Sequence, residues 1–407
     1  MNASTRATVA GLILMTGLAC AATGGGLRGG TEAPRWVGTW ACGPQLTEPG
    51  NNPPPPGLRG NTLRQIVYTS IGGRRLRLRL SNEFGDGPVT MRAVHVATST
   101  GGDAIDAGTD RALAFSGAGA VTIPPGQAVW SDAFDFALAP QTRLAVTIGF
   151  GGVPGGVTGH PGSRTTSYLA AGDAVASPSL PAAATTDHWY YITGVDVIAD
   201  ARAAALVTLG DSLTDGRGST TNGHDRWPDN LSRRLRANAA TAQVAVLNLG
   251  IGGNAVVAGG LGPTATQRFT RDVLGQSGVR WLIVFEGVND ICGAGGGQQA
   301  ADDLITAYSQ LIDLAHARGV RVYGATLTPI GGSHYDSTEH EAARQTVNTW
   351  IRTSGRFDAV IDLDVAVGDP DKPATLLAAH DSGDHLHLNA TGYEHVADAV
   401  GLALFVQ

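Results

Sequence analysis

From about residue 200 onward, apolar runs of strand length alternate with stretches of helical periodicity, and this alternation restricts the fold more than any other feature of the chain. The clearest predicted helix covers about 300–318, where the apolar residues share one face and Gly319 is placed to end it. The predicted strands are 204–209, 244–249, 281–285, 320–327 and 359–363. Strands separated by helices form a parallel sheet that is covered on both faces. The pattern therefore predicts an α/β domain with three layers, α/β/α.

Before residue 200 the signals are those of short strands. Leucines alternate with arginines over 75–80, and Gly72-Gly73 in front of them predicts a tight hairpin turn. Similar runs occur at 91–97, 120–123, 143–150 and 189–198. Because no long helical period interrupts these strands, we predict a β-sandwich of the jelly-roll kind over residues 36–200, followed by the α/β domain over residues 201–407.

The first 22 residues have the layout of an export signal. A single cation, Arg6, precedes an apolar run and then small residues around Cys20. The apolar run is too short to span a bilayer, so we expect no stable membrane insertion. We expect residues 1–22 to be removed and the protein to be secreted, with residues 23–35 as a linker; lipid attachment at Cys20 is the alternative.

The two cysteines beyond the signal bear on how the chain is held together. Cys42 and Cys292 are the only thiols left once the signal is removed. Exported proteins often pair such cysteines, so the sequence predicts either a Cys42–Cys292 disulfide or two buried thiols.

The charge of the chain limits its partners. The formal net charge is −7, with 28 basic and 35 acidic residues among 407. Such a chain lacks the broad positive potential that attracts nucleic acids and anionic membranes. We therefore expect no nucleic-acid partner.

Two short segments, far apart in the sequence, carry residue types suited to nucleophilic catalysis. Ser212 follows the first predicted strand of the α/β domain, and Asp384 precedes His387 by three residues near the end of the chain. A serine hydroxyl needs an imidazole to take its proton, and the imidazole needs a carboxylate to orient it. Taken separately, Ser212 could simply cap a helix, and an Asp-x-x-His segment could be a solvated loop.

Four sequence blocks together resemble the GDSL or SGNH hydrolase family. They occur in the family's order: Gly-Asp-Ser-Leu around Ser212, the segment from Asn248 to Asn254, Gly-Val-Asn-Asp around Asn289, and Asp384-x-x-His387. The resemblance covers about residues 204–404. It implies an SGNH-type fold with a serine mechanism that needs no cofactor and no metal.

The resemblance also implies the role of each site residue. Ser212 is expected to attack the acyl carbon, His387 to act as base and then acid, and Asp384 to orient His387. The oxyanion is expected to lie between the backbone N–H groups of Ser212 and Gly253 and the side-chain amide of Asn289.

Competing interpretations of the same residues have weaker support. The segment 250–255 fits a dinucleotide fingerprint, but no acidic strand end follows it. His385 and His387 lack further metal ligands in the sequence pattern, and the Gly-x-Ser-x-Gly elbow of α/β-hydrolases is absent.

The expected substrate is a small-molecule or polysaccharide ester, with acetylated carbohydrate as the first expectation. Lipase or phospholipase activity is the alternative. A second hypothesis, which is not an enzyme, is a carbohydrate-binding protein whose hydrolase domain is inert. Segments of the β domain also resemble a bacterial two-domain subgroup of these hydrolases; within them His160 and Arg164 could face the cleft or could simply be loop residues.

Overall fold

The computed structural model describes residues 35–293 and 295–406. The predicted export signal lies outside these residues, as does the predicted linker except for Arg35. The described residues belong to one compact unit, Pro34–Gln407.

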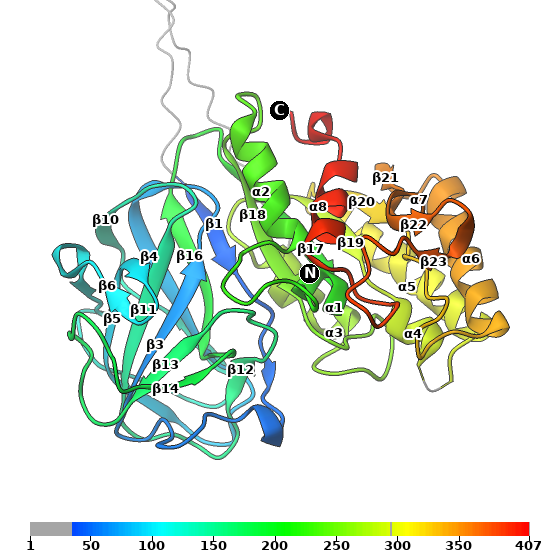
Figure 1. Ribbon diagram of the computed structural model, residues 1–407. Helices are drawn as coiled ribbons and strands as arrows, with labels where there is room; N and C mark the ends of the chain where they lie inside the picture. Colours follow the sequence, from blue (N-terminus) through cyan, green and yellow to red (C-terminus); the bar gives the residue numbers. More distant parts are fainter. Residues whose placement is uncertain (1–34, 294, 407) are drawn as a thin grey trace, which may run out of the picture. The chain divides into compact units, whose positions relative to one another are not determined.

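The carboxyl-terminal half contains a five-stranded sheet in which every neighbouring pair of strands is parallel. This confirms the predicted parallel sheet, and each predicted strand is found close to its expected place (Figure 1). In spatial order the strands are β18 (Val244–Gly250), β17 (Ala204–Gly210), β19 (Val279–Phe285), β20 (Arg321–Ala325) and β21 (Ala359–Ile361). The carboxyl ends of the strands meet at one edge, where ligands of such sheets bind.

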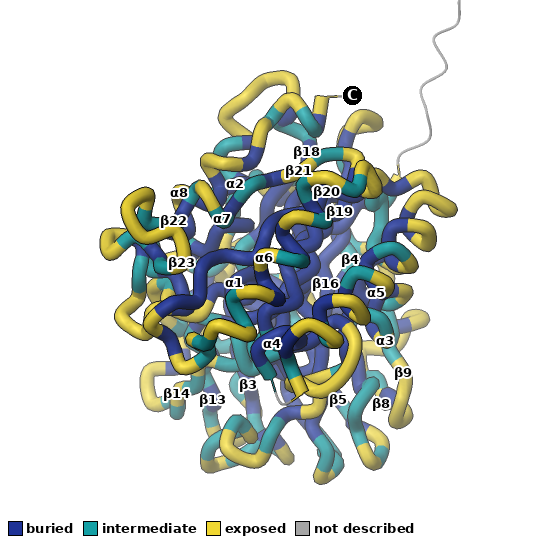
Figure 2. Tube along the Cα trace, turned by 90° about the vertical axis from the view of Figure 1, so that its right-hand side faces the viewer, coloured by how far each residue is buried: buried dark blue, intermediate teal, exposed yellow. Residues whose placement is uncertain are grey.

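Helices cover both faces of this sheet because its strands are apolar on both sides. In β17, Ala205 and Val207 belong to one hydrophobic cluster, whereas Ala204 and Leu206 belong to the other. Figure 2 shows the buried strands beneath more exposed helices. The helices are α1 (Ser212–Asp215), α2 (Trp227–Ala237), α3 (Ala265–Phe269), α4 (Val288–Cys292), α5 (Gln298–His316), α6 (Thr338–Thr353), α7 (Leu363–Val367) and α8 (Ala390–Ala399). Among the residues described, no helix combines the length and apolarity needed to cross a bilayer.

Short irregular elements complete this half. They are a π-helical turn, Thr270–Leu274, a 3-10 turn, Leu402–Phe405, and a two-stranded sheet of β22 (Gly368–Asp369) and β23 (Lys372–Leu376).

The amino-terminal part consists largely of antiparallel strands in two larger sheets and one small one. The first sheet contains β1 (Trp36–Ala41), β16 (Ile192–Ile198), β4 (Gly73–Asn82), β10 (Phe134–Leu138) and β9 (Gln127–Trp130). The second contains β14 (Ala184–Thr186), β13 (Ser167–Ala170), β3 (Thr62–Tyr68), β11 (Arg143–Phe150), β5 (Val89–Gly101), β6 (Ala104–Ile105), β7 (Arg111–Ala112) and β8 (Val121–Ile123). The small sheet contains β15 (Trp189–Tyr190), β12 (Thr158–His160) and β2 (Gln45–Leu46), and 3-10 turns occur at Pro49–Asn51 and Ala107–Thr109. The jelly-roll connectivity stays a prediction.

The predicted hairpin at Gly72-Gly73 is wrong. β3 pairs with β11 and β13, whereas β4 pairs with β16, β10 and β9, so the two strands lie in different sheets. Gly72 marks a crossing between sheets, where a side chain would clash with the carbonyl of Leu138. A turn dipeptide specifies local chain reversal but not which strand becomes the partner.

The hydrophobic core continues across the predicted boundary near residue 200. Val37 and Trp40 of β1 belong to the same cluster of buried residues as Leu247 and Leu249 of β18. A Cβ placed on Gly38 would lie 2.8 Å from a methyl group of Leu247, so β1 packs tightly against the parallel sheet. The β part is therefore joined to the α/β part by a shared core.

Of the two alternatives for Cys42 and Cys292, the structure has the second, since both are buried free thiols. The Cys42 thiol donates to the carbonyl of Ile192 over 3.4 Å and lies in the field of Asp272. Cys292 instead lies in the field of Arg344, a residue of α6. The two thiols thus occupy different surroundings, and burial raises the pKa of Cys292 to about 12, which keeps that thiol protonated.

Candidate active site

Ser212 stands at the carboxyl end of a central parallel strand. β17 ends at Gly210, and Ser212 begins α1. Asp211 caps this turn, since its side chain accepts a hydrogen bond from the Leu213 N–H over 2.9 Å. Ser212 keeps 8% of its surface exposed and lines a cleft.

The structure brings Ser212 together with the two residues from the far end of the chain. The Oγ of Ser212 lies 2.8 Å from Nε2 of His387, and Nδ1 of His387 lies 2.7 Å from Oδ2 of Asp384. The other carboxylate oxygen of Asp384 accepts the backbone N–H groups of Leu386 and His387. The carboxylate is thereby fixed before it orients the imidazole, and the three groups form a continuous series of hydrogen bonds.

Burial and hydrogen bonding set the charge states of this series. Burial lowers the pKa of His387 below its usual value, although Asp384 partly offsets that effect. Partial burial tends to raise the pKa of Asp384, but hydrogen bonds from His387 outweigh it and hold the pKa well below the usual range. Near neutral pH the imidazole is therefore free to accept a proton, while the carboxylate stays ionised.

Both predicted oxyanion-hole residues line the same cleft as Ser212 and His387. Gly253 has a φ of +70°, a left-handed conformation that glycine adopts without strain. Asn289 lies in α4, and its amide donates to the carbonyl of Asn254 over 2.8 Å. Among the described residues, the backbone N–H groups of Ser212 and Gly253 have no hydrogen-bond acceptor. These donors remain available to a ligand.

Tyr335 orients the Asn289 amide and was missed by the sequence analysis. Its hydroxyl donates to Oδ1 of Asn289 over 2.9 Å, and the ring lines the cleft. This contact fixes which end of the amide carries the donor nitrogen. Tyr335 lies in a loop outside the four blocks, so no sequence signal pointed to it.

The acidic neighbours of the site residues accept backbone N–H groups. Asp290 accepts from Val256 and Val257, which follow Gly253 in the chain, at 2.9 Å each. Asp215 accepts from the Gly252 N–H over 3.0 Å. Two carboxylates thus fix the loop that carries Gly253.

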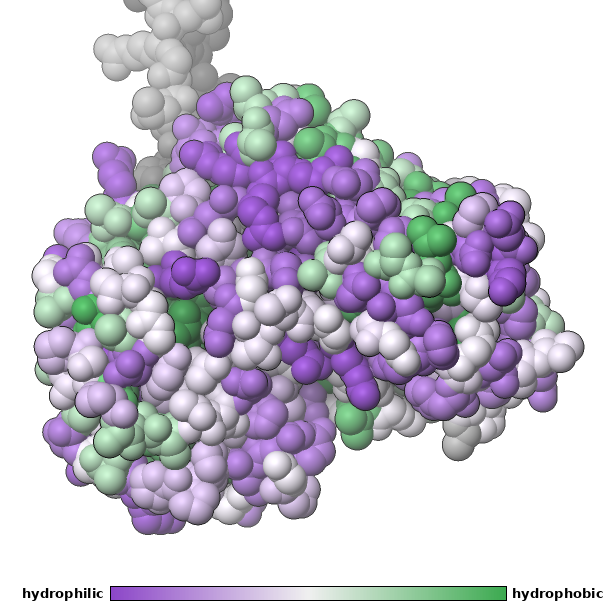
Figure 3. All heavy atoms as spheres, viewed as in Figure 1, coloured by the Kyte–Doolittle hydropathy of each residue, from purple (hydrophilic) through white to green (hydrophobic). Residues whose placement is uncertain are grey.

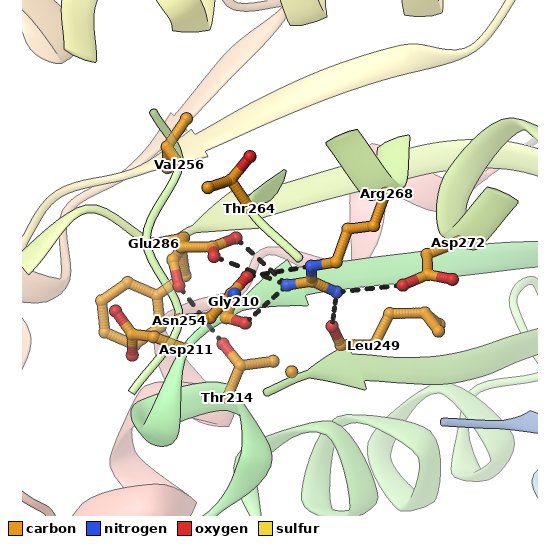
Figure 4. A network of polar contacts seen from close by, with 12 residues as sticks. Gly210, Asp211, Thr214, Leu249, Asn254, Val256, Thr264, Arg268, Asp272 and Glu286 are labelled. Atoms are coloured by element: carbon orange, nitrogen blue, oxygen red, sulfur yellow. Dashed lines mark hydrogen bonds and ion pairs between the residues drawn. The ribbon is translucent and has the colours of Figure 1, made fainter. Parts of the chain in front are cut away.

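A buried arginine joins the strand ends beneath the site (Figure 4). The guanidinium of Arg268 donates to the carbonyl groups of Gly210 and Leu249 and to the side chain of Asn254. It also forms ion pairs with Asp272 and with Glu286, whose side chain is fully buried. Burial raises the pKa of Glu286 to about 8, although Arg268 opposes that shift. This network connects β17, β18 and the residue after β19.

The β part contributes a wall of the cleft. It supplies Gln45, Glu48, Asn51, Arg164 and His188 to the lining. Arg164 therefore does face the cleft, as one of the two interpretations held. Residues of the β part and of the α/β part therefore line the cleft together. The four sequence blocks lie only in the α/β part and do not show this.

His160 instead lies behind the cleft and connects the two parts of the molecule. Its Nε2 lies 2.9 Å from Oδ1 of Asp215, and its Nδ1 lies 2.9 Å from the carbonyl of Gly43. A carbonyl and a carboxylate both accept hydrogen bonds, so each ring nitrogen of His160 faces an acceptor. Gly162 packs so closely on Asp215 that a side chain there would overlap the carboxylate. One oxygen of the Asp215 carboxylate therefore contacts His160 of the β part, and the other accepts the Gly252 N–H.

His385 pairs with a carboxylate of its own loop. Its Nδ1 pairs with Asp381 over 2.6 Å, and its ring is largely exposed. Across residues 35–293 and 295–406, the His, Cys, Asp and Glu side chains form no group of three or more that could hold a metal ion.

Comparisons with known proteins bear on the α/β part. Residues 208–395 match the GDSL-like lipase/acylhydrolase family. A search among curated proteins finds no match. Similar solved structures include a catalytic mutant of an acetylxylan esterase from Geobacillus stearothermophilus, with 19% identity over 48% of this chain and 91% of that one and a TM-score of 0.38. A GDSL-like lipase from Bacteroides thetaiotaomicron has 16% identity over 49% of this chain and 87% of that one and a TM-score of 0.36.

The family match covers the strand–turn segment with Ser212 and continues through Asp384 and His387. It therefore contains every residue of the hydrogen-bonded series described above. Over residues 208–395, which make up less than half of the chain, this protein is similar to the GDSL-like lipase/acylhydrolase family.

Proposed function

We propose that this protein is a serine esterase that hydrolyses carboxylic esters through an acyl-enzyme on Ser212. The observation that carries this proposal is the series of hydrogen bonds from Ser212 Oγ through His387 to Asp384, with distances of 2.8 and 2.7 Å. Ser212, His387 and the oxyanion donors line one cleft, so a single ligand there can contact all of them.

The chemistry follows from these contacts in two steps. Ser212 Oγ attacks the acyl carbon while its proton passes to Nε2 of His387, and the alcohol leaves with that proton. Water then attacks the acyl-enzyme, with His387 again accepting a proton and returning it to Ser212. Asp384 stays ionised and stabilises the imidazolium that forms in each step.

The negative charge of each tetrahedral intermediate needs fixed donors. The Ser212 and Gly253 N–H groups and the Asn289 amide border the cleft, and Tyr335 holds that amide in one orientation. Removing one such donor typically costs about 3 to 4 kcal/mol of transition-state stabilisation.

As substrate we propose short acyl groups on carbohydrate. The cleft lining supports this choice because it is rich in polar side chains, including Gln45, Asn51, His188 and His334. On the face shown in Figure 3, apolar residues form only small, separated patches. A polar cleft suits a hydroxyl-rich alcohol better than a long acyl chain.

We also propose that the protein acts outside the cell. The support is the order of Arg6, an apolar run and small residues within the first 22 positions.

The test compares the purified protein with Ser212→Ala on 4-nitrophenyl acetate and then on acetylated xylan. Ser212-dependent release of acetate from both supports the proposal. Equal rates for the two proteins would exclude the serine mechanism. A preference for long acyl chains across a series of 4-nitrophenyl esters would assign the protein to lipid substrates instead, and the absence of any turnover would favour a binding protein.

A further inference from the structure

The cleft contains two guanidinium groups to which the catalytic series assigns no role. Arg164 comes from the β part and Arg217 from the turn after α1, and both line the cleft with Ser212 and His387. Within residues 35–293 and 295–406, neither guanidinium has a side-chain hydrogen bond or an ion pair, although the two backbones are both bonded. The donor groups of both guanidiniums therefore have no partner among the described residues.

The acidic groups that line the same cleft are already occupied. Asp215 accepts from His160 and from the Gly252 N–H. Glu48 accepts from the side-chain amides of Gln45 and Asn51, at 2.6 and 3.0 Å. The carboxylates that line the cleft are thus bonded to neighbours other than these arginines, and the two guanidiniums have no acceptor. A ligand that bonds to both guanidiniums would supply an anionic acceptor.

Arg164 is held in place at a conformational cost. Its φ is +51°, which is uncommon for a residue with a Cβ atom. The Asn222 N–H donates to the Arg164 carbonyl over 2.9 Å, and the Asn222 side chain accepts from the Thr166 N–H over 2.8 Å. In addition, Nε of Arg164 is buried and has no partner. Strained backbone clusters at ligand sites, and a buried donor without a protein partner is accounted for by a bound ligand.

Both arginines also act on the catalytic base from nearby. Burial is the main cause that lowers the pKa of His387, and the positive charges of Arg217 and Arg164 add to it. An anion bound between these arginines would therefore lie close to the reacting groups.

We propose that Arg164 and Arg217 bind a carboxylate on the substrate, so that the enzyme prefers esters in which a carboxylate lies close to the acyl bond. An O-acetylated uronate is one such substrate, with the carboxylate on the alcohol part. A dicarboxylic half-ester, with the carboxylate on the acyl part, has the same chemistry. The planar guanidinium donates two parallel hydrogen bonds to a carboxylate, which gives both charge and geometric selectivity. This inference rests on the proposed esterase function.

The experiment measures, within each variant, the ratio of kcat/KM for a charged ester to that for its neutral counterpart. One arm compares O-acetyl galacturonate with its methyl ester, and the other compares 4-nitrophenyl succinate with 4-nitrophenyl acetate. We expect a ratio well above one in at least one arm, and the arm that shows it identifies which part of the substrate carries the anion. Arg164→Gln and Arg217→Gln should each lower that ratio about tenfold, as loss of a charged hydrogen bond does.

Arg318→Gln is the matched control, since Arg318 is exposed and lies outside the cleft lining. It should leave the ratio unchanged. Added salt should lower the ratio of the unmodified protein, because screening weakens partly exposed ion pairs.

A second measurement does not depend on turnover. Galacturonate should bind to Ser212→Ala more tightly than galactose does, and the difference should disappear when Arg164→Gln is added. Ser212-dependent hydrolysis without preference for charge in either arm, or with a preference that survives both arginine variants, would overturn the inference while leaving the esterase function intact. Absence of Ser212-dependent hydrolysis of every ester would overturn both.

Discussion

The α/β part and the β part contribute to one cleft in different ways. The α/β part carries Ser212, Asp384 and His387, whose contacts form at the carboxyl end of a parallel sheet. The β part reaches this edge with His160, which bonds Asp215, and with Arg164, which lines the cleft. The α/β part therefore holds the whole hydrogen-bonded series, whereas the β part supports and lines its surroundings. The difference teaches that a set of hydrogen-bonded side chains can be local to one fold while the cleft around it is shared.

The largest expected effect is the loss of the Ser212 hydroxyl. Ser212→Ala should lower kcat on 4-nitrophenyl acetate by about 10⁴-fold or more, because loss of a serine nucleophile removes the covalent route. Ser179→Ala, at an exposed serine of the β part, is the control and should keep full activity. Comparable losses for the two variants would contradict the division between the parts.

The next largest effect tests the carboxylate of the α/β part. Asp384→Asn keeps the size of the side chain but no longer fixes the His387 tautomer, so kcat should fall about 10³- to 10⁴-fold. Steady-state kinetics on the same ester measure this change. If the rate stays within tenfold of the unmodified protein, another group orients His387.

The oxyanion hole should show an intermediate effect. Asn289→Ala removes one side-chain donor and should lower kcat about 10²- to 10³-fold. Tyr335→Phe only frees the amide to turn and should have a smaller effect on kcat in the same direction. A larger loss for Tyr335→Phe than for Asn289→Ala would mean that Tyr335 contacts the substrate itself.

The support from the β part should matter less for rate and more for stability. His160→Phe keeps a ring beside Trp189 but removes both hydrogen bonds, and leaves the buried Asp215 carboxylate with one partner fewer. We expect a loss of about 1 to 3 kcal/mol in unfolding free energy, measured by chemical denaturation, with the serine still reactive. A loss of activity as large as that of Ser212→Ala, in a folded protein, would place His160 among the reacting groups.

The smallest expected effect is a shift along the pH axis. His387 accepts a proton only when neutral, so kcat/KM should rise with pH through its pKa and level off above it. Burial, Arg217 and Arg164 lower this pKa below the usual value of about 6.5, while Asp384 raises it. The limb should therefore lie below about pH 6.5. Arg217→Gln removes a positive charge, so it should move the limb to higher pH, whereas Arg318→Gln should leave it in place.

Much of the α/β part could be predicted from the sequence because its signals are local and periodic. The helix expected at 300–318 is α5, Gln298–His316, and the strand expected at 204–209 is β17. Motif order pointed to Ser212, Asp384 and His387, which the structure brings within hydrogen-bond distance.

The β part was harder to predict because its pairing is not local. Gly72-Gly73 looked like a hairpin, but β3 and β4 pair in different sheets. The sequence left a Cys42–Cys292 disulfide and two buried thiols as open alternatives for a similar reason, since two cysteines in a sequence say nothing about the distance between them; the structure has two buried thiols.

The sequence by itself determined the class of the α/β part and pointed to the residues of the hydrogen-bonded series, because both depend on short patterns that can be recognised without knowledge of the fold. Only the tertiary structure decided that His160 bonds Asp215 behind the site, that Tyr335 orients Asn289, and that Arg164 and Arg217 share the cleft. These contacts join residues that are close in space but distant along the chain. Packing of the β part against the parallel sheet creates them, and no short pattern of residue types encodes that packing.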